Sequence, residues 1–226
     1  DINDCCFDEN RITNLATSVQ SAGGAIYIEP NCTKLDIVQT IMTGNQSNTG
    51  LGGAISLGAN NNLNLINCQL GGNVANTNGG AVAVGSETDS NTTTLVFKNC
   101  SLTDNMANEL GGAVFAKNCN ADFVDCYINR NTAWSGGGLH FVTTSKLKVI
   151  GGTMIANKAI GNKAEGGAAT MLYVPATFIN CQVMENRSDY TGGAFVFKGH
   201  SSSNSLMHNC LFAKNYAKET GGSIVL

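Results

Sequence analysis

The sequence predicts an all-β fold, a right-handed parallel β-helix of about eight coils, on the basis of three observations. A Gly pair followed by a small residue and an apolar run recurs eight times along the 226 residues, at spacings of 25 to 32 residues. An apolar-x-x-Asn tetrad precedes every pair. The period is too short for a βαβ unit, and evidence for helix is weak throughout, so one repeat is expected to form one turn of a solenoid.

The residues after each Gly pair are expected to form a strand. The second and fourth positions after the pair are usually apolar, as at Ile26 and Ile28, which is the alternation of a strand with one buried face. In "SGGGLHF" the pair is taken to begin at Gly136, a register that turns His140 outward. The pair itself supplies a tight bend that a Cβ would obstruct.

A second strand is expected before each tetrad. It is seen in "LINC", "FKNC", "FVDC", "FINC" and "MHNC", with inward anchors at Leu65, Phe97, Phe123, Phe178 and Met207. From these anchors to the following Gly pair the distance is always 13 or 14 residues, whereas the return to the next anchor varies from 12 to 18 residues. One corner of the coil is therefore fixed, and the other tolerates insertions.

The tetrad asparagines predict an internal ladder, in which each amide bonds its counterparts in the coils above and below, about 4.8 Å away. Buried amides require such partners. The alternative is a row of surface asparagines selected for turn propensity. The eight positions are Asn10, Asn45, Asn73, Asn105, Asn131, Asn157, Asn186 and Asn215.

The outward side of the Gly-pair strand is expected to form a flat, unusually apolar face. Its first position is mostly Ala, and contiguous apolar patches tend to be contact sites. This face is predicted to pack against another part of the chain, a neighbouring subunit or a host receptor. The candidate binding residues are Tyr27, Phe115, His140, Thr170, Val196 and Val225.

Six of the nine cysteines share one coil position, five residues before the tetrad Asn: Cys5, Cys68, Cys100, Cys126, Cys181 and Cys210. Stacked coils bring such residues within disulfide range, so Cys68–Cys100 and Cys181–Cys210 are candidate pairs. Cys126 could instead pair with Cys119, and Cys5 or Cys6 with Cys32. The alternative is a stack of buried, reduced thiols. A metal site is not expected, because no Cys-x-x-Cys pattern is present.

Five N-x-S/T sequons occur, about as many as this Asn-, Ser- and Thr-rich composition gives by chance. Asn45 and Asn186 belong to the expected ladder, and Asn99 belongs to the second strand. The candidate glycosylation sites are therefore Asn31 and Asn91, which lie in the variable returns.

Composition limits the partners. The formal charge is −3 and only three Arg are present, so no nucleic acid partner is expected. No apolar run approaches the roughly 20 residues that span a bilayer.

No linker divides the chain, and residues 1–226 are expected to form one domain without a cofactor. Because the sequence opens inside a coil and ends inside a strand, we expect it to be part of a longer passenger or fibre.

The two motifs resemble the FxxN and GGA(I/L/V) repeats of the chlamydial polymorphic outer membrane proteins. "GGAI" at Gly23 and Gly52 and "GGAV" at Gly79 fit the second motif, but Phe opens the tetrad only at Phe7 and Phe212. The resemblance implies an adhesive passenger at the cell surface or secreted, contacting a protein receptor or copies of itself, and exported through a C-terminal membrane barrel that these residues do not include.

The residues give little support to two other functions. A polysaccharide lyase or hydrolase needs clustered carboxylates, and the outward positions of the Gly-pair strand carry none. Glu87 and Asp89 could bind a cation, but a charged loop tip is the preferred explanation for them. The "KGH" at Lys198 to His200 resembles a hydrolase fragment only superficially, because the flanking "SSSNS" is typical of a solvated loop. An ice-binding face would need Thr in one register, which the clusters "NTTT" and "VTTS" do not keep. The sequence therefore favours an adhesive or structural protein that is not an enzyme.

Overall fold

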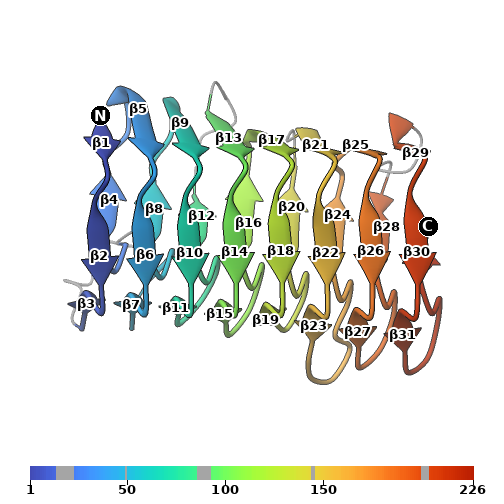
Figure 1. Ribbon diagram of the computed structural model, residues 1–226. Coiled ribbons are helices and arrows are strands. Elements are labelled where there is room, and N and C mark those ends of the chain that lie inside the picture. The colour runs from blue at the N-terminus through green and yellow to red at the C-terminus, as the bar shows by residue number, and fades with distance from the viewer. Residues whose placement is uncertain (14–22, 49, 86–92, 144–145, 200–203) are drawn as a thin grey trace.

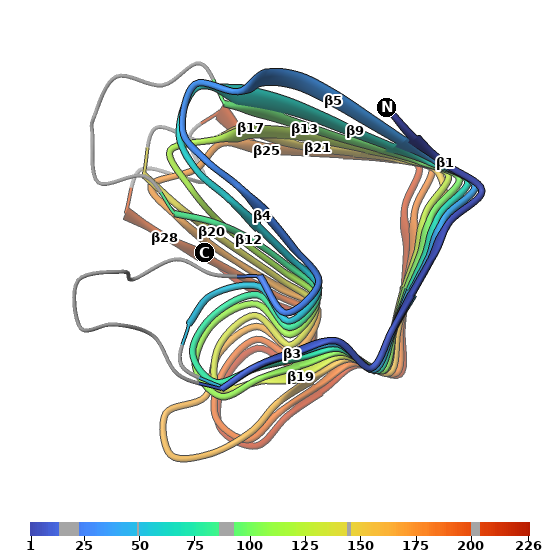
Figure 2. The same ribbon diagram turned by 90° about the vertical axis from the view of Figure 1, so that its left-hand side faces the viewer.

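The computed structural model describes residues 1–13, 23–48, 50–85, 93–143, 146–199 and 204–226, and it confirms the predicted parallel β-helix. Four parallel sheets, here called A to D, each contain eight strands, one from every repeat (Figure 1). Seen from the N-terminal end, the chain passes through sheets A, B, C and D clockwise as it recedes from the viewer, which makes the coil right-handed (Figure 2). Coils are numbered 1 to 8 from the N-terminus.

The strands of each sheet follow one another in chain order. Sheet A contains β1 (Ile2–Asn3), β5 (Thr33–Val38), β9 (Asn61–Ile66), β13 (Thr94–Lys98), β17 (Asn120–Val124), β21 (Lys146–Ile150), β25 (Ala176–Ile179) and β29 (Leu206–His208). Sheet B contains β2 (Cys6–Asp8), β6 (Ile41–Thr43), β10 (Gln69–Gly71), β14 (Ser101–Thr103), β18 (Tyr127–Asn129), β22 (Thr153–Ile155), β26 (Gln182–Met184) and β30 (Leu211–Ala213). Sheet C contains β3 (Arg11–Ile12), β7 (Gln46–Ser47), β11 (Val74–Ala75), β15 (Met106–Ala107), β19 (Thr132–Ala133), β23 (Lys158–Ala159), β27 (Arg187–Ser188) and β31 (Tyr216–Ala217). Sheet D contains β4 (Ile26–Ile28), β8 (Ile55–Leu57), β12 (Val82–Val84), β16 (Val114–Lys117), β20 (Leu139–Val142), β24 (Ala169–Leu172), β28 (Phe195–Lys198) and β32 (Ile224–Val225).

The tetrad itself forms a strand and a corner, which the sequence did not reveal. In coil 4, Leu102 of β14 points inward and is fully buried, Asp104 turns the chain with φ of 57°, and Asn105 points inward again. The residue before the tetrad Asn has positive φ in every coil, so a left-handed residue makes each B-to-C corner. Each coil therefore has four strands rather than the two identified from the sequence.

The core consists of inward rows that run along the helix axis. The anchors predicted for the second strand lie in one row of sheet A, where Phe97 pairs in register with Leu65 and with Phe123. The rings of Phe97 and Phe123 stack with centroids 4.6 Å apart and an interplanar angle of 3°. In sheet D, Val114 pairs with Leu139, which is the register implied by a Gly pair that begins at Gly136.

The two glycines of each pair are required for different reasons. Gly111 has φ of +66°, and a Cβ there would collide with the Val114 carbonyl of the sheet D strand in its own coil. Gly112 has no such φ, but its Cβ would collide with the Gly137 carbonyl of the next coil and lie 2.6 Å from the backbone nitrogen of Thr132 in sheet C. The backbone of the pair thus lies close to both sheet C and sheet D, which leaves no room for a Cβ.

Candidate contact surfaces

The outer side of sheet D is not the exposed face that the sequence predicted. Its outward residues do form one row, since Phe115, His140, Thr170 and Val196 pair in register along β16, β20, β24 and β28. However, they are only 7%, 5%, 2% and 0% exposed, respectively. Val225 is partly buried, and only Tyr27 in coil 1, at 42%, is well exposed. The Ala positions beside them, from Ala54 to Ala194, are fully buried as well.

The cause is a segment that folds over this row. After sheet C the chain leaves in an outward loop and returns to an inner corner before sheet D, so the loop covers part of the outer side of the sheet (Figure 2). The first Gly of the pair lies directly against the row: a Cβ on Gly136 would be 2.9 Å from the His140 Cβ, and one on Gly79 would be 2.8 Å from the Ala83 Cβ. The predicted binding face is therefore an internal packing layer.

His140 lies within this layer. Burial lowers the pKa of its imidazole to about 4, although a hydrogen bond to the Ser135 backbone opposes the shift, and the positive charge of Lys198 adds to it. The neighbouring Ser135 hydroxyl donates to Thr170 Oγ1 at 3.2 Å, and Lys198 forms an ion pair with Glu165. The imidazole is consequently neutral at neutral pH, and its Nδ1 has no hydrogen-bond partner among the residues that the structure describes.

The predicted asparagine ladder is present along all eight coils. From Asn10 to Asn186, each Nδ2 donates to the Oδ1 of the Asn in the next coil at 2.9 to 3.0 Å, and the same Oδ1 accepts the backbone N–H of the donating residue. The second Nδ2 hydrogen goes to a backbone carbonyl of the preceding coil, as from Asn105 to Leu70 at 3.0 Å. Every hydrogen-bonding group of an interior ladder amide is thereby satisfied.

The aligned cysteines are free thiols; Cys68, Cys100, Cys126 and Cys181 are buried in the core, Cys210 is partly buried against it, and Cys5 is exposed. Cys68, Cys100 and Cys126 follow one another in coils 3 to 5, and their side chains are hydrogen-bonded in sequence. The hydrogen bond with Cys126 raises the pKa of Cys100 to about 11, and burial together with the charge of Cys210 raises that of Cys181 to about 12. The structure thus contains the reduced stack, and Cys68–Cys100 and Cys181–Cys210 are close enough to remain candidate disulfides.

The other two disulfide predictions are wrong. Cys119 precedes β17 and Cys126 follows it, so the extended strand places them roughly 20 Å apart. Cys32 precedes β5, whereas Cys5 and Cys6 lie beyond the opposite end of sheet A, because Asn3 pairs with Val38. In both cases the length of a sheet A strand separates the two cysteines.

The sequon asparagines differ in their exposure to solvent. Asn45 and Asn186 are fully buried in the ladder, as expected. Asn31 is exposed, and its Oδ1 accepts a hydrogen bond from Asn60, while Asn91 lies outside the described residues. The sequence places Asn99 in the second strand, but the structure places it at the exposed corner after β13, with φ of 52°. It is therefore a further accessible sequon.

Within the described ranges, no group of three His, Cys, Asp or Glu side chains is arranged to hold a metal ion. Glu87, Asp89 and His200 lie outside those ranges. Lys198 is occupied by its ion pair with Glu165.

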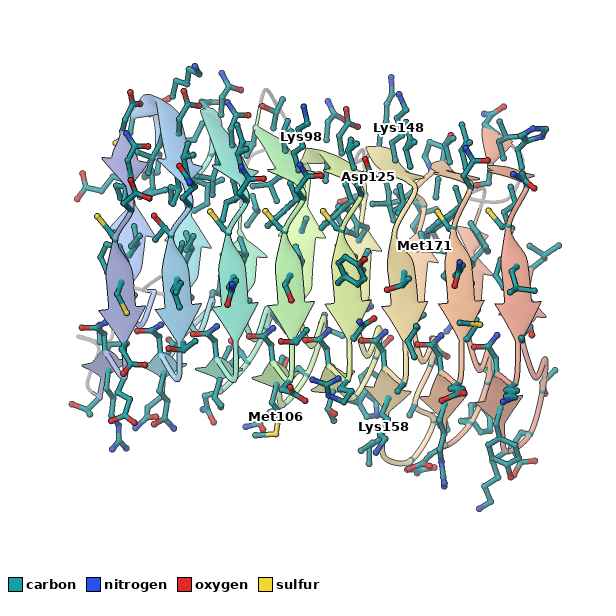
Figure 3. The ribbon with its side chains drawn as sticks, viewed as in Figure 1. Lys98, Met106, Asp125, Lys148, Lys158 and Met171 are labelled. Atoms are coloured by element: carbon teal, nitrogen blue, oxygen red, sulfur yellow. The ribbon has the colours of Figure 1, made fainter. Side chains whose placement is uncertain are left out.

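Exposed apolar side chains also occur on sheet C, which the sequence did not identify as a sheet. One large apolar side chain is exposed in each of coils 4 to 8, on sheet C or in the turn that follows it. We call these five residues the sheet C stripe: Met106 (42% exposed), Trp134 (40%), Ile160 (49%), Tyr190 (37%) and Tyr216 (53%). Figure 3 shows Met106 projecting on this side, opposite to Lys98 and Lys148 of sheet A. The signal in the sequence was a large apolar residue within four positions of the tetrad Asn.

No family model matches the chain, and no match was found among curated proteins or solved structures. In the part of the chain that the structure describes, no helix is long and apolar enough to cross a membrane.

Proposed function

We propose that the chain is a non-catalytic adhesive or structural protein, located at a cell surface or secreted, that contacts a receptor or copies of itself through its outer sheets. The observation that carries this proposal is the sheet C stripe. One large apolar side chain is exposed on this side in each of coils 4 to 8. Exposed apolar surface that gathers on one side of a soluble protein is characteristic of contact sites.

The interior supports the same proposal, because it makes the outer surface rigid. The asparagine ladder and the aligned core rows hold each coil in register with the next. Side chains on the outside therefore keep their relative positions along the axis without an additional scaffold. The motifs shared with the polymorphic outer membrane proteins favour the same kind of role.

Adhesion can be tested with beads coated with the folded chain and applied to cultured epithelial monolayers. Beads coated with chain that has been unfolded and blocked are the control, and sedimentation velocity measures self-association in parallel. We expect adhesion or self-association that depends on folding. The proposal fails if the folded chain does neither, or if it depolymerises acidic polysaccharides with or without Ca²⁺, since depolymerisation would identify a carbohydrate-active enzyme.

A further inference from the structure

Three buried cysteines of coils 3 to 5, Cys68, Cys100 and Cys126, lie in one row at the corner between sheets A and B, where Figure 3 shows sulfur atoms in yellow. The Cys68 carbonyl accepts the Ser101 N–H, and the Cys100 carbonyl accepts the Tyr127 N–H, both at 2.9 Å. The corner therefore keeps the register of the strands. Neighbouring Cα atoms of the row are about 4.8 Å apart, within the range of about 4.4 to 6.8 Å that disulfides accept.

The row of adjacent thiols is limited to these three residues. The same position is Thr40 in coil 2, because the Thr40 carbonyl accepts the backbone N–H of the residue after Cys68. It is Gly152 in coil 6, so the next cysteine lies two coils beyond Cys126. Two coils are about 9.6 Å, which is too far for a disulfide, and the same distance separates Cys68 from Cys126. Every disulfide within the row must therefore contain Cys100.

The side chains are already arranged for such a bond. Each sulfur is directed toward the preceding coil: Cys100 Sγ lies 3.3 Å from the Leu65 carbonyl oxygen, and Cys126 Sγ lies 3.4 Å from that of Phe97. Cys100 is also hydrogen-bonded to the side chains of both Cys68 and Cys126. The middle thiol can thus bond to either neighbour without a change in the order of the coils.

One thiol of the row ionises more easily than the others. The hydrogen bond with Cys100 lowers the pKa of Cys126, against the effect of burial, and the same contact raises the pKa of Cys100 to about 11. The hydrogen bond with Cys100, together with burial, raises the pKa of Cys68. Because the thiolate is the form that reacts with oxidants, Cys126 is expected to react first.

We propose that Cys68, Cys100 and Cys126 form an oxidisable unit that holds one disulfide at a time, always through Cys100. A peroxide, which is small enough to need only a slight opening of the corner, oxidises the Cys126 thiolate to a sulfenic acid and is reduced to hydroxide and the sulfenic oxygen. The Cys100 thiol then attacks that sulfur, the S–S bond forms, and water leaves. A Cys68 thiolate can attack Cys100 in turn, which releases Cys126 as a thiolate and moves the disulfide to coils 3 and 4.

The disulfide would cross-link the middle of the solenoid. It joins residues that are 26 apart for Cys100–Cys126 and 32 apart for Cys68–Cys100, and closing such a loop restricts the unfolded chain. Oxidation should therefore raise the urea midpoint and slow hydrogen exchange in coils 3 to 5, and dithiothreitol should reverse both effects. This role belongs to the interior and does not depend on the proposed adhesive function.

The test treats the folded chain with hydrogen peroxide, alkylates the remaining thiols in urea and maps the tryptic peptides by mass spectrometry. The exposed Cys5, Cys6 and Cys32 are replaced by Ser to prevent bridges between chains. Trypsin cleaves after Lys98 and Lys117, which places the three cysteines of the row in separate peptides. We expect one disulfide per chain within the row, found as two alternative products that both contain the middle cysteine.

Single substitutions in this background separate the possibilities. Cys68→Ser should leave only the Cys100–Cys126 product, and Cys126→Ser should leave only the Cys68–Cys100 product. Cys100→Ser should form no disulfide within the row. Cys119→Ser is the matched control, because Cys119 is buried but lies at the other end of β17, and both products should persist in it.

Circular dichroism melting curves identify any variant that fails to fold, and the remaining variants then still test the inference. The inference is overturned if Cys100→Ser still joins Cys68 to Cys126, or if all three thiols of the folded parent remain open to alkylation after peroxide. It also fails if the row is converted only to sulfinic acid. Chain oxidised in urea should lose the preference for Cys100, and an unchanged set of products there would contradict the role of the stacked coils.

Discussion

The asparagine ladder should contribute stability, and Asn105 in coil 4 is the position that tests it. Asn105→Ala removes four hydrogen bonds of 3.0 Å: two donated by its Nδ2, to Asn131 Oδ1 and to the Leu70 carbonyl, and two accepted by its Oδ1, from the N–H and Nδ2 of Asn73. Asn131 Oδ1 keeps the backbone N–H of residue 105 as a donor, and Asn73 Nδ2 keeps the Met42 carbonyl.

The backbone N–H of Asn73 and one hydrogen of its Nδ2 are then left in a fully buried site without an acceptor. A buried polar group without a partner costs about 1 to 3 kcal/mol. Two such groups therefore lower the free energy of unfolding by about 2 to 6 kcal/mol, a large fraction of the 5 to 15 kcal/mol typical of a folded domain.

The matched control is Asn108→Ala in the same coil. Asn108 also donates its Nδ2 to an Asn of the preceding coil, Asn76, at 3.0 Å, but this bond lies in solvent, so the change should cost less than about 0.5 kcal/mol. Urea unfolding gives the two differences in free energy. Hydrogen exchange at coils 3 to 5 then shows whether the loss is local, because repeat arrays can open in segments. Equal urea midpoints for the two variants would refute the stabilising role of the ladder.

Three further predictions follow from the packing. Gly112→Ala should abolish folding or cost more than about 4 kcal/mol, because its Cβ collides with backbone, whereas Gly72→Ala should cost only about 1 to 2 kcal/mol for its left-handed φ; expression yield and urea unfolding compare them. His140 has a folded pKa near 4, below its unfolded value, so the unfolded chain binds the proton first. The free energy of unfolding of the parent should fall by up to about 3 kcal/mol as pH decreases from 6.5 to 4 because of this group. The His140→Phe variant should lack this part of the pH dependence. Iodoacetamide should alkylate exposed Cys32 in the folded chain and spare Cys119, whose pKa burial raises, until urea is added; peptide mass spectrometry would detect early labelling of Cys119 as a contradiction.

The interior could be predicted from the sequence because every coil imposes the same constraint on it. Asn105 must match an amide above and below, and Phe97 must stack on its neighbours at the strand spacing, so the same residue types recur at fixed distances. The Gly pair recurs for a steric reason of the same kind. Sequence periodicity reports such constraints directly.

The outer surface could be predicted only in part. The alternation of the strand correctly predicts that Phe115 and His140 point away from the core. It gives no information on whether another segment covers them. The covering loop lies between sheets C and D. The strands of sheet C before it have two residues each, too few to show a period of two, so both the sheet and the stripe escaped detection.

Sheet C shows why recognition is expected on the outside of this solenoid. Its inward positions after coil 1 are only Ser or Ala, from Ser47 to Ala217, because the second Gly of each pair brings backbone against this sheet and leaves no room for a larger side chain. The outward positions beside them range from Val74 through Met106 to Arg187 without disturbing the register. A change at an outward position therefore alters the contact surface at little cost in stability, whereas an inward change destabilises the fold. Differences among the coils can accumulate on the outer face of sheet C, as the register row of Met106, Arg187 and Tyr216 shows.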